Sequence, residues 1–279
     1  MPSSRLAFPI TCRHTAVMDE HGLKQAICDV GRRMYDNHFL AANDGNISVR
    51  VGPGRFLCTP TGVSKGWMTP ADIAVVDDQG RQLEGQRPRT SEILLHLEIY
   101  HALPEVHAVC HAHPPHATAF AVAGLPLPAG FMPEAEVLLG PVPLAEYHTP
   151  GSEGVARSIL PHLKNKANTI LLAHHGVVAC DKTLEQAYFH LETADMYARI
   201  LLLAQQVGTL HRLNESQMRE LLAAKGAMGL DDPRLGHPAA PLYIGENFPP
   251  PAATPAAVTL DDRTLERLAD MVAERLTRK

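Results

Sequence analysis

The stretches AVCHAHPPH (108–116) and TILLAHHGVVAC (169–180) decide the fold expected for this chain of 279 residues. In the first, a short apolar strand runs into histidines and is stopped by Pro114 and Pro115, because proline cannot donate to a sheet's hydrogen-bond ladder. The second predicts one long buried strand over 169–179, which carries another histidine pair. The first pattern places its histidines at the end of a strand, and the second places a histidine pair on a buried strand.

The segments around these two strands complete a sheet with helices. Apolar spacing near 3.6 residues predicts helices over 19–40, 93–100, 115–123 and 183–207. Alternating or short apolar runs predict strands over 47–50, 56–59 and 74–77. The order of these elements indicates an α/β fold with three layers, in which helices cover both faces of a mostly antiparallel central sheet.

Three of the 16 histidines form a candidate metal site. His111 and His113 stand at positions i and i+2 of an extended chain, so their rings point the same way. His175 follows a buried apolar strand and precedes Gly176, whose small size allows close backbone approach. Neutral imidazoles without thiolates suit catalytic zinc or another divalent metal. The alternative is that His174 and His175 are core histidines bonded to the backbone, an interpretation we favour for His174.

Polar groups in the turns supply further candidates. Glu92 lies in the first turn of a predicted helix, where it either caps the helix or serves as a ligand, acid or base beside a metal. The turns at 43–46, 59–62 and 90–91 carry hydroxyl groups and free amides that suit a phosphate group. Each of these turns, taken alone, is also an ordinary turn.

The ordered set of motifs resembles the class II aldolase/adducin family, most closely its fuculose-phosphate aldolases. The motifs are GNISV (45–49), TPTG (59–62), TSE (90–92), HAH (111–113) with His116, YxxPGS (147–152) and HHGVVAC (174–180). The resemblance covers about residues 19–215. It implies a class II aldolase-like fold, a sugar-phosphate substrate, and a homotetramer with active sites at subunit interfaces.

The resemblance also implies a role for individual residues. His111, His113 and His175 would bind Zn²⁺, and Glu92 would be both a resting ligand and the acid/base. The phosphate-binding residues would be Gly45, which shapes the loop, and Asn46, Thr61, Gly62, Thr90 and Ser91.

One position departs from the family pattern. Where fuculose-phosphate aldolases carry an interface tyrosine that donates a proton, this chain has Met132, whose thioether has no proton to give. Glu134, Glu136 and Tyr147 are the candidate replacements. Glu136 in EVLLG also resembles the acid/base glutamate of methylthioribulose-phosphate dehydratases.

The expected function is therefore a zinc-dependent aldolase. It would cleave fuculose or rhamnulose 1-phosphate to dihydroxyacetone phosphate and lactaldehyde. A dehydratase, a 4-epimerase and a decarboxylase are the alternatives within the family. A non-catalytic, adducin-like binding protein is the alternative of another class, but such members would be expected to lose the metal ligands.

The composition limits the partners and the cellular location that we expect for this protein. A net charge of -5 gives no reason to expect nucleic acid as a partner. Five scattered cysteines without a CxxC pair indicate a reducing compartment. No apolar run approaches the roughly 20 residues of a membrane helix. We expect a cytoplasmic protein that does not bind a membrane.

The two ends of the chain differ from its body. Residues 1–18 are expected to form an arm and 19–230 the catalytic domain. Residues 231–258, rich in proline and alanine, are predicted to be an extended linker. Residues 259–279 predict an amphipathic helix. This tail resembles the encapsulation peptides that bind shell proteins of bacterial microcompartments, although a helix for oligomerisation or for docking on the chain's own body fits equally.

Overall fold

A computed structural model describes residues 19–236, 241–245, 261, 267, 270 and 271. The chain divides into two compact units, residues 1–248 and 249–279. In the second unit, the described residues Arg267, Asp270 and Met271 are helical. The predicted arm over 1–18 and most of the predicted tail helix lie outside the described residues, so both stay predictions.

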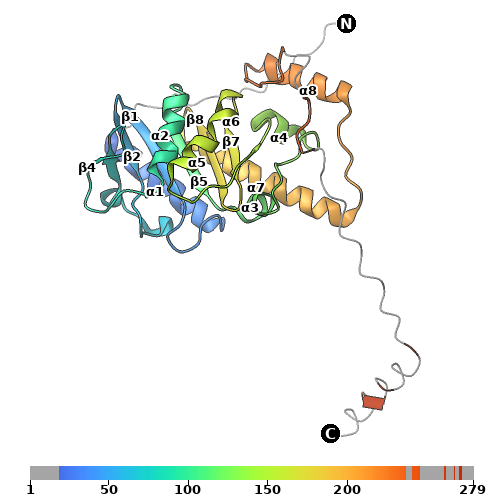
Figure 1. The fold of residues 1–279 in the computed structure, drawn as a ribbon, viewed down its shortest axis with the longest axis horizontal. Coiled ribbons are helices and arrows are strands. Elements are labelled where there is room, and N and C mark those ends of the chain that lie inside the picture. Colours follow the sequence, from blue (N-terminus) through green and yellow to red (C-terminus); the bar gives the residue numbers. More distant parts are fainter. Residues whose placement is uncertain (1–18, 237–240, 246–260, 262–266, 268–269, 272–279) are drawn as a thin grey trace. The chain divides into compact units, whose positions relative to one another are not determined.

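An eight-stranded sheet forms the centre of the first unit, within the described residues (Figure 1). Its order is β4-β3-β2-β1-β5-β8-β7-β6, and all neighbours are antiparallel except β6 and β7. The strands are β1 (Asn46–Gly52), β2 (Arg55–Cys58), β3 (Ala74–Val76), β4 (Gln82–Glu84), β5 (Ala108–Ala112), β6 (Leu144–Ala145), β7 (Thr169–Leu172) and β8 (Gly176–Asp181). The predicted mostly antiparallel α/β sheet is confirmed.

Helices cover both faces of this sheet. They are α1 (Glu20–Asp36), α2 (Ile93–Ala102), α3 (Pro115–Val122), α4 (Pro133–Leu138), α5 (Glu153–Ser158), α6 (Leu160–Lys164), α7 (Leu184–Val207) and α8 (Glu215–Ala227), with short 3₁₀ turns at Lys65–Trp67 and Pro70–Asp72. The core over one face is shared with α1, α3 and α7, and the core over the other with α2, α5 and α6. Because side chains alternate along a strand, Cys110 of β5 packs in the first core and Val109 in the second. His111 therefore projects toward the α2 side.

The prediction of one long strand over 169–179 is wrong. The chain forms β7, turns at 173–175, and returns as β8 in antiparallel register with β7. His174 occupies the left-handed region with φ 55°. The turn contains no glycine or proline before Gly176, and apolar residues continue on both sides, so the sequence shows no break. The correction moves His175 from a strand into a turn.

The predicted linker begins too early. Among the described residues after 230, Asp232 and Arg234 are buried. Arg234 contacts Asp232 at 2.8 Å and Glu136 at 2.7 Å, and the Lys225 ammonium lies 2.9 Å from Asp232. Buried charges persist only when they are paired. This buried ion cluster of Glu136, Lys225, Asp232 and Arg234 holds residues 231–236 against α4 and α8, whereas 246–258 lie outside the described residues.

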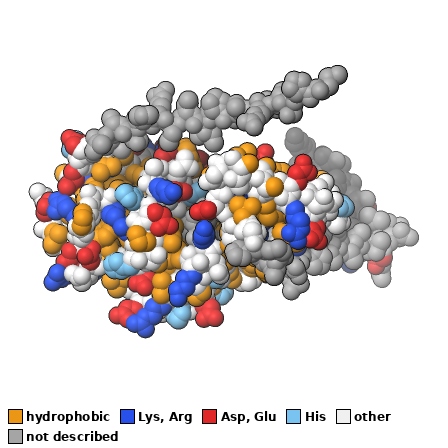
Figure 2. Space-filling view, turned by 90° about the horizontal axis from the view of Figure 1, so that it is seen from above, with side chains coloured by type: hydrophobic (Ala, Val, Ile, Leu, Met, Phe, Trp, Pro, Cys, Tyr) orange, Lys and Arg blue, Asp and Glu red, His pale blue; other side chains and the backbone are white. Residues whose placement is uncertain are grey.

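The hydropathy of the helices and the distribution of charge on the surface are two further features of the described residues. None of the described helices is long and apolar enough to cross a bilayer. On the face seen in Figure 2, acidic and basic side chains are interspersed among hydrophobic ones.

Asp232→Asn should destabilise the protein by about 3–5 kcal/mol, because it leaves Lys225 and Arg234 buried without their shared counter-charge. The neighbouring Asp231 is the matched control, since its side chain is 86% exposed and lies 3.6 Å from Lys166. Asp231→Asn should change stability by less than about 1 kcal/mol. Urea denaturation of both variants measures the difference, and equal midpoints would contradict a stabilising role for the cluster.

The same cluster predicts a stability loss in acid. Burial alone would raise the pKa of Asp232, but Arg234 and Lys225 outweigh it and hold the pKa at about 2. Since this lies below the ordinary value of 3.8, the contribution of Asp232 is present above pH 4 and is lost as the pH falls toward 2. In acid titrations followed by circular dichroism, Asp232→Asn should flatten this part of the stability profile.

Candidate metal centre

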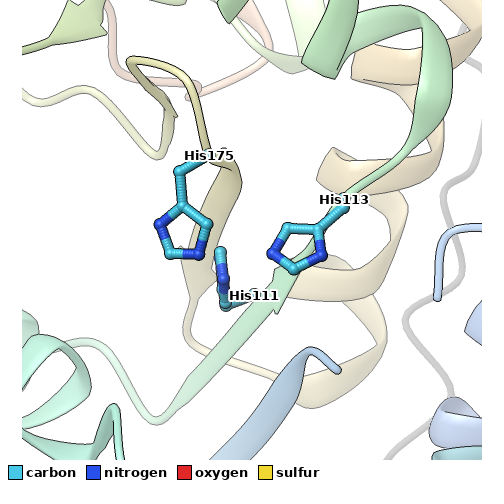
Figure 3. Close-up of side chains that lie close together, drawn as sticks. All are labelled: His111, His113 and His175. Atoms are coloured by element: carbon cyan, nitrogen blue, oxygen red, sulfur yellow. The ribbon is translucent and has the colours of Figure 1, made fainter. Parts of the chain in front are cut away.

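Three histidines from two segments meet at one end of the sheet. His111 lies near the end of β5, His113 just beyond it, and His175 in the turn before β8. The pairing of Ala112 with Val177 brings that turn beside the end of β5. One ring nitrogen from each histidine lies within 4.8 Å of the others. Figure 3 shows the three rings converging on one point.

Hydrogen bonds behind two of these rings determine which nitrogen faces inward. His111 Nδ1 donates to the carbonyl of Val177 at 2.9 Å, and His113 Nδ1 donates to Asp44 Oδ2 at 2.8 Å. In a neutral ring, Nε2 then carries the free lone pair. Both Nε2 atoms are buried and have no hydrogen-bond partner among the described residues. A carboxylate behind a histidine, as Asp44 is here, is typical of metal ligands.

Glu92 completes the cluster. It occupies the N-cap position of α2, but its side chain makes no capping hydrogen bond, so the simple capping interpretation is wrong. Instead, Oε2 lies 3.5 Å from His111 Nε2, and Oε1 lies 3.5 Å from His175 Nε2. Oε1 is buried without a hydrogen-bond partner in the described part of the chain. Three imidazoles and one carboxylate with unpaired inward atoms fit zinc or a similar divalent ion.

The protonation states suit metal binding. Burial lowers the pKa of His111 to about 3, although Glu92 opposes the shift. Burial also lowers the pKa of His175 against the same carboxylate. For Glu92, burial alone would raise the pKa, but the adjacent rings of His111 and His175 and the Asn46 amide leave it below 4.5. At neutral pH the rings of His111 and His175 are therefore neutral and Glu92 is ionised, the forms that bind metal.

Two glycines allow the close approach of these segments. A β-carbon on Gly176 would lie 2.5 Å from the carbonyl oxygen of Ala112 and from the ring of His113. Gly45 has φ 65°, and its β-carbon would overlap the Leu40 side chain. The expected close approach at Gly176 is thus confirmed. His174 is not part of the cluster; its amide donates to Ala121 and its ring lies 6.0 Å from that of Tyr147.

The predicted phosphate turns lie beside Glu92. The amide of Thr90 donates to Thr59, and that of Thr61 donates to Pro88, each at 3.0 Å, so the two loops run side by side. Thr90 is buried and its hydroxyl accepts from the Glu92 amide at 3.3 Å, whereas Ser91 is exposed. Gly62 has φ 71°, and a β-carbon added there would meet no atom within 4 Å. The phosphate-binding roles of Thr61, Gly62, Thr90 and Ser91 stay predictions.

The side-chain amide of Asn46 already makes hydrogen bonds within the site, which the sequence does not indicate. Its Nδ2 donates to Glu92 Oε2 at 2.7 Å, and its Oδ1 faces His96 Nε2 at 2.5 Å. One amide hydrogen is left to serve a phosphate beside Gly45, so the predicted phosphate role of Asn46 rests on that hydrogen.

The candidate proton donors are placed differently from one another. Glu136 is buried; its Oε1 accepts from the Gly130 amide at 2.5 Å, and its Oε2 lies 2.7 Å from Arg234. These contacts are those of a charged acceptor, so the expectation that Glu136 donates a proton is not supported. Tyr147 is 55% exposed and lies next to His174. It stays a prediction.

Sequence reasoning missed two residues of the site. Asp44 orients His113, but its turn indicated only a phosphate loop. His96 lies one helical turn after Glu92 and is fully buried, and the sequence pattern marks it only as one position of the helix predicted over 93–100. The spacing of four residues between Glu92 and His96 was the signal that could have linked them, because such residues share a helix face.

The sequence and the fold of this chain are similar to those of known proteins. Residues 25–202 match the Class II Aldolase and Adducin N-terminal domain. The 3-oxo-tetronate 4-phosphate decarboxylase of Cupriavidus necator is 32% identical over 65% of this chain and 84% of its own. The 5-methylthioribulose-1-phosphate/5-deoxyribulose-1-phosphate aldolase of Escherichia coli is 33% identical over 76% of this chain and 99% of its own. A solved L-fuculose 1-phosphate aldolase superposes with TM-score 0.68 at 28% identity, covering 74% of this chain and 96% of that one.

The chain belongs to the class II aldolase and adducin family. With fuculose-phosphate aldolases among its relatives, it is a metal-dependent class II aldolase, a lyase that acts on carbon–carbon bonds.

His175→Asn should abolish tight metal binding, because it removes one of three nitrogen ligands. The neighbouring His174 offers a matched control: His174→Asn should keep about one metal ion per chain, and asparagine tolerates the left-handed backbone there. Elemental analysis after dialysis against a weak chelator measures both. Full occupancy in the His175 variant, or loss in the His174 variant, would contradict the assigned cluster.

Proposed function

We propose that this protein is a zinc-dependent aldolase that cleaves a deoxyketose 1-phosphate, fuculose or rhamnulose 1-phosphate, to dihydroxyacetone phosphate and lactaldehyde. The observation that carries the proposal is the Glu92 carboxylate, which faces the Nε2 atoms of His111 and His175 and has a buried oxygen without a hydrogen-bond partner among the described residues. The retained ligand set also argues against the adducin-like binding alternative.

Each part of the site has a defined task. A divalent metal held by His111, His113 and His175 would act as a Lewis acid on the ketose oxygens. In the direction of bond formation, Glu92 Oε1 accepts the proton from C3 of dihydroxyacetone phosphate. The electron pair left on C3 forms the new bond to the aldehyde carbon, and a second group protonates the aldehyde oxygen. Cleavage is the reverse, and we propose Tyr147 as that second group.

The candidate substrates differ in the half of the sugar that is released as the aldehyde. Fuculose, rhamnulose, methylthioribulose and deoxyribulose 1-phosphates share the same phosphorylated three-carbon half. The same metal site and phosphate turns would therefore serve any of them. The relative that matches over 99% of its own length acts on the latter two sugars, which adds them to the candidate substrates.

Decarboxylation is the second candidate, and Met132 favours it. Loss of carbon dioxide from a 3-oxo-tetronate 4-phosphate leaves the same electron pair on the three-carbon fragment. No aldehyde oxygen has to be protonated in that reaction, so it needs no replacement for the family tyrosine. One of the relatives above carries this activity in its name.

We further propose a cytoplasmic homotetramer with active sites at subunit interfaces. An apolar stripe on α7 is exposed and supports such an assembly; its members are Met196, Ile200, Leu203 and Val207. The tail at 259–279 is proposed to bind either a microcompartment shell protein or the chain's own body. Light scattering measures the assembly, and a fluorescent fusion of residues 255–279 that fails to co-purify with shell proteins would remove the first role of the tail.

Glu92→Gln should lower kcat by about 100- to 10,000-fold, because the amide cannot accept a proton. The three histidines should keep the metal bound. Glu98→Gln on the same helix is the control and should retain activity. A Glu92 variant with bound metal and nearly normal turnover would remove the acid/base role.

Release of dihydroxyacetone phosphate identifies the reaction. We expect it from at least one of fuculose, rhamnulose, methylthioribulose and deoxyribulose 1-phosphates, with an equimolar aldehyde. Incubation with a 3-oxo-tetronate 4-phosphate tests the second candidate, since carbon dioxide replaces the aldehyde there. A coupled reductase assay with parallel aldehyde and carbon dioxide detection separates the two. Activity that survives complete chelation of the metal would overturn both.

A further inference from the structure

We propose that His96 is a positioning residue that sets the orientation of the Asn46 amide and thereby aims the Glu92 carboxylate at the histidine cluster. The inference deepens the proposed function and rests on it.

A continuous chain of hydrogen bonds runs beneath Glu92. Asn46 Nδ2 lies 2.7 Å from Glu92 Oε2, and His96 Nε2 lies 2.5 Å from Asn46 Oδ1. On the other side of the ring, Ser48 Oγ lies 2.7 Å from His96 Nδ1 and 2.8 Å from the Tyr100 hydroxyl. The four side chains behind Glu92 are all at most 2% exposed. Bulk water therefore does not compete for these bonds.

The direction of each bond follows from the charge on Glu92. An ionised carboxylate only accepts, so Asn46 must turn its NH₂ group toward Glu92 and its oxygen toward His96. His96 must then donate from Nε2, which leaves Nδ1 as an acceptor. Burial lowers the pKa of His96 to about 4, so the ring is neutral and carries one proton. Ser48 donates to Nδ1 and accepts from the Tyr100 hydroxyl.

The backbone fixes the position of Asn46 but not the direction in which its side-chain amide faces. Asn46 pairs with His111 in the β1–β5 register, so its α-carbon is fixed beside the cluster. Rotation of the amide by half a turn would point Oδ1 at Glu92 Oε2 and bring two acceptors together. The donor at His96 Nε2 prevents this rotation. Oε2 is thereby held, and Oε1 stays directed at His175.

Two substitutions separate this role from simple packing. In His96→Gln the amide nitrogen can take the place of Nε2 and still donate to Asn46. In His96→Asn the shorter side chain reaches only the place of Nδ1, so Asn46 loses its donor. His190→Asn is the control, because His190 is another buried histidine, bonded to Asp181 and Asn168 away from Glu92.

The readouts are Zn²⁺ affinity by chelator competition, the visible spectrum of the Co²⁺-substituted protein, and kcat and KM separately. His96→Asn should weaken metal binding by about 10- to 100-fold, as loss of an outer partner of a ligand does. It should also alter the cobalt spectrum and lower kcat more than it raises KM. His96→Gln should recover most of each property, and His190→Asn should bind metal as the parent protein does.

The outcomes distinguish this inference from the proposed function. Equal losses in the Gln and Asn variants, or no loss in either, would overturn the positioning role. A parent protein without bound metal or turnover would overturn the proposed function instead. Long-range ¹H–¹⁵N spectra of the metal-free parent protein test the chain of hydrogen bonds. We expect the His96 proton on Nε2. A proton on Nδ1 would overturn the inference.

Discussion

The antiparallel pairing of β5 with β1 and β8 is the constraint on which the site depends. It places Asn46 opposite His111, and Val177 opposite Ala112. The turn that carries His175 directly precedes β8, so the register also determines where that histidine lies. Because side chains alternate along a strand, a shift of one residue in β5 would turn His111 to the other face of the sheet. The geometry of the centre is thus a property of strand register.

The candidate metal centre and the buried ion cluster differ in whether their buried polar atoms have partners. Asp232 is paired with Lys225 and Arg234, so its charge is balanced by the chain itself. In the centre, Glu92 Oε1 and the Nε2 atoms of His111 and His113 face one another unpaired among the described residues. Leaving such atoms without partners costs free energy. A cation held by these residues would offset this cost, which is why the arrangement indicates a metal site rather than a structural polar network.

Most of the fold and the candidate histidine cluster could be predicted because they depend on local patterns. The spacing of His111 and His113 on an extended strand and the helical period of 184–207 are visible in the sequence. The β7–β8 turn was missed because its flanks are buried on both sides and lack the usual alternation. The start of the linker was misjudged because the burial of Asp232 and Arg234 depends on Glu136, which is distant in sequence.

By itself, the sequence determined the residue types that can bind a metal and their order along the chain, since imidazole and carboxylate chemistry belongs to the side chain. Tertiary structure alone decided how these groups are used. It turned Glu92 away from capping α2, committed Asn46 to that carboxylate, and occupied Glu136 with Arg234. The physical reason is that a buried polar group takes the partner that packing brings within hydrogen-bond distance, and packing joins residues that the sequence keeps apart.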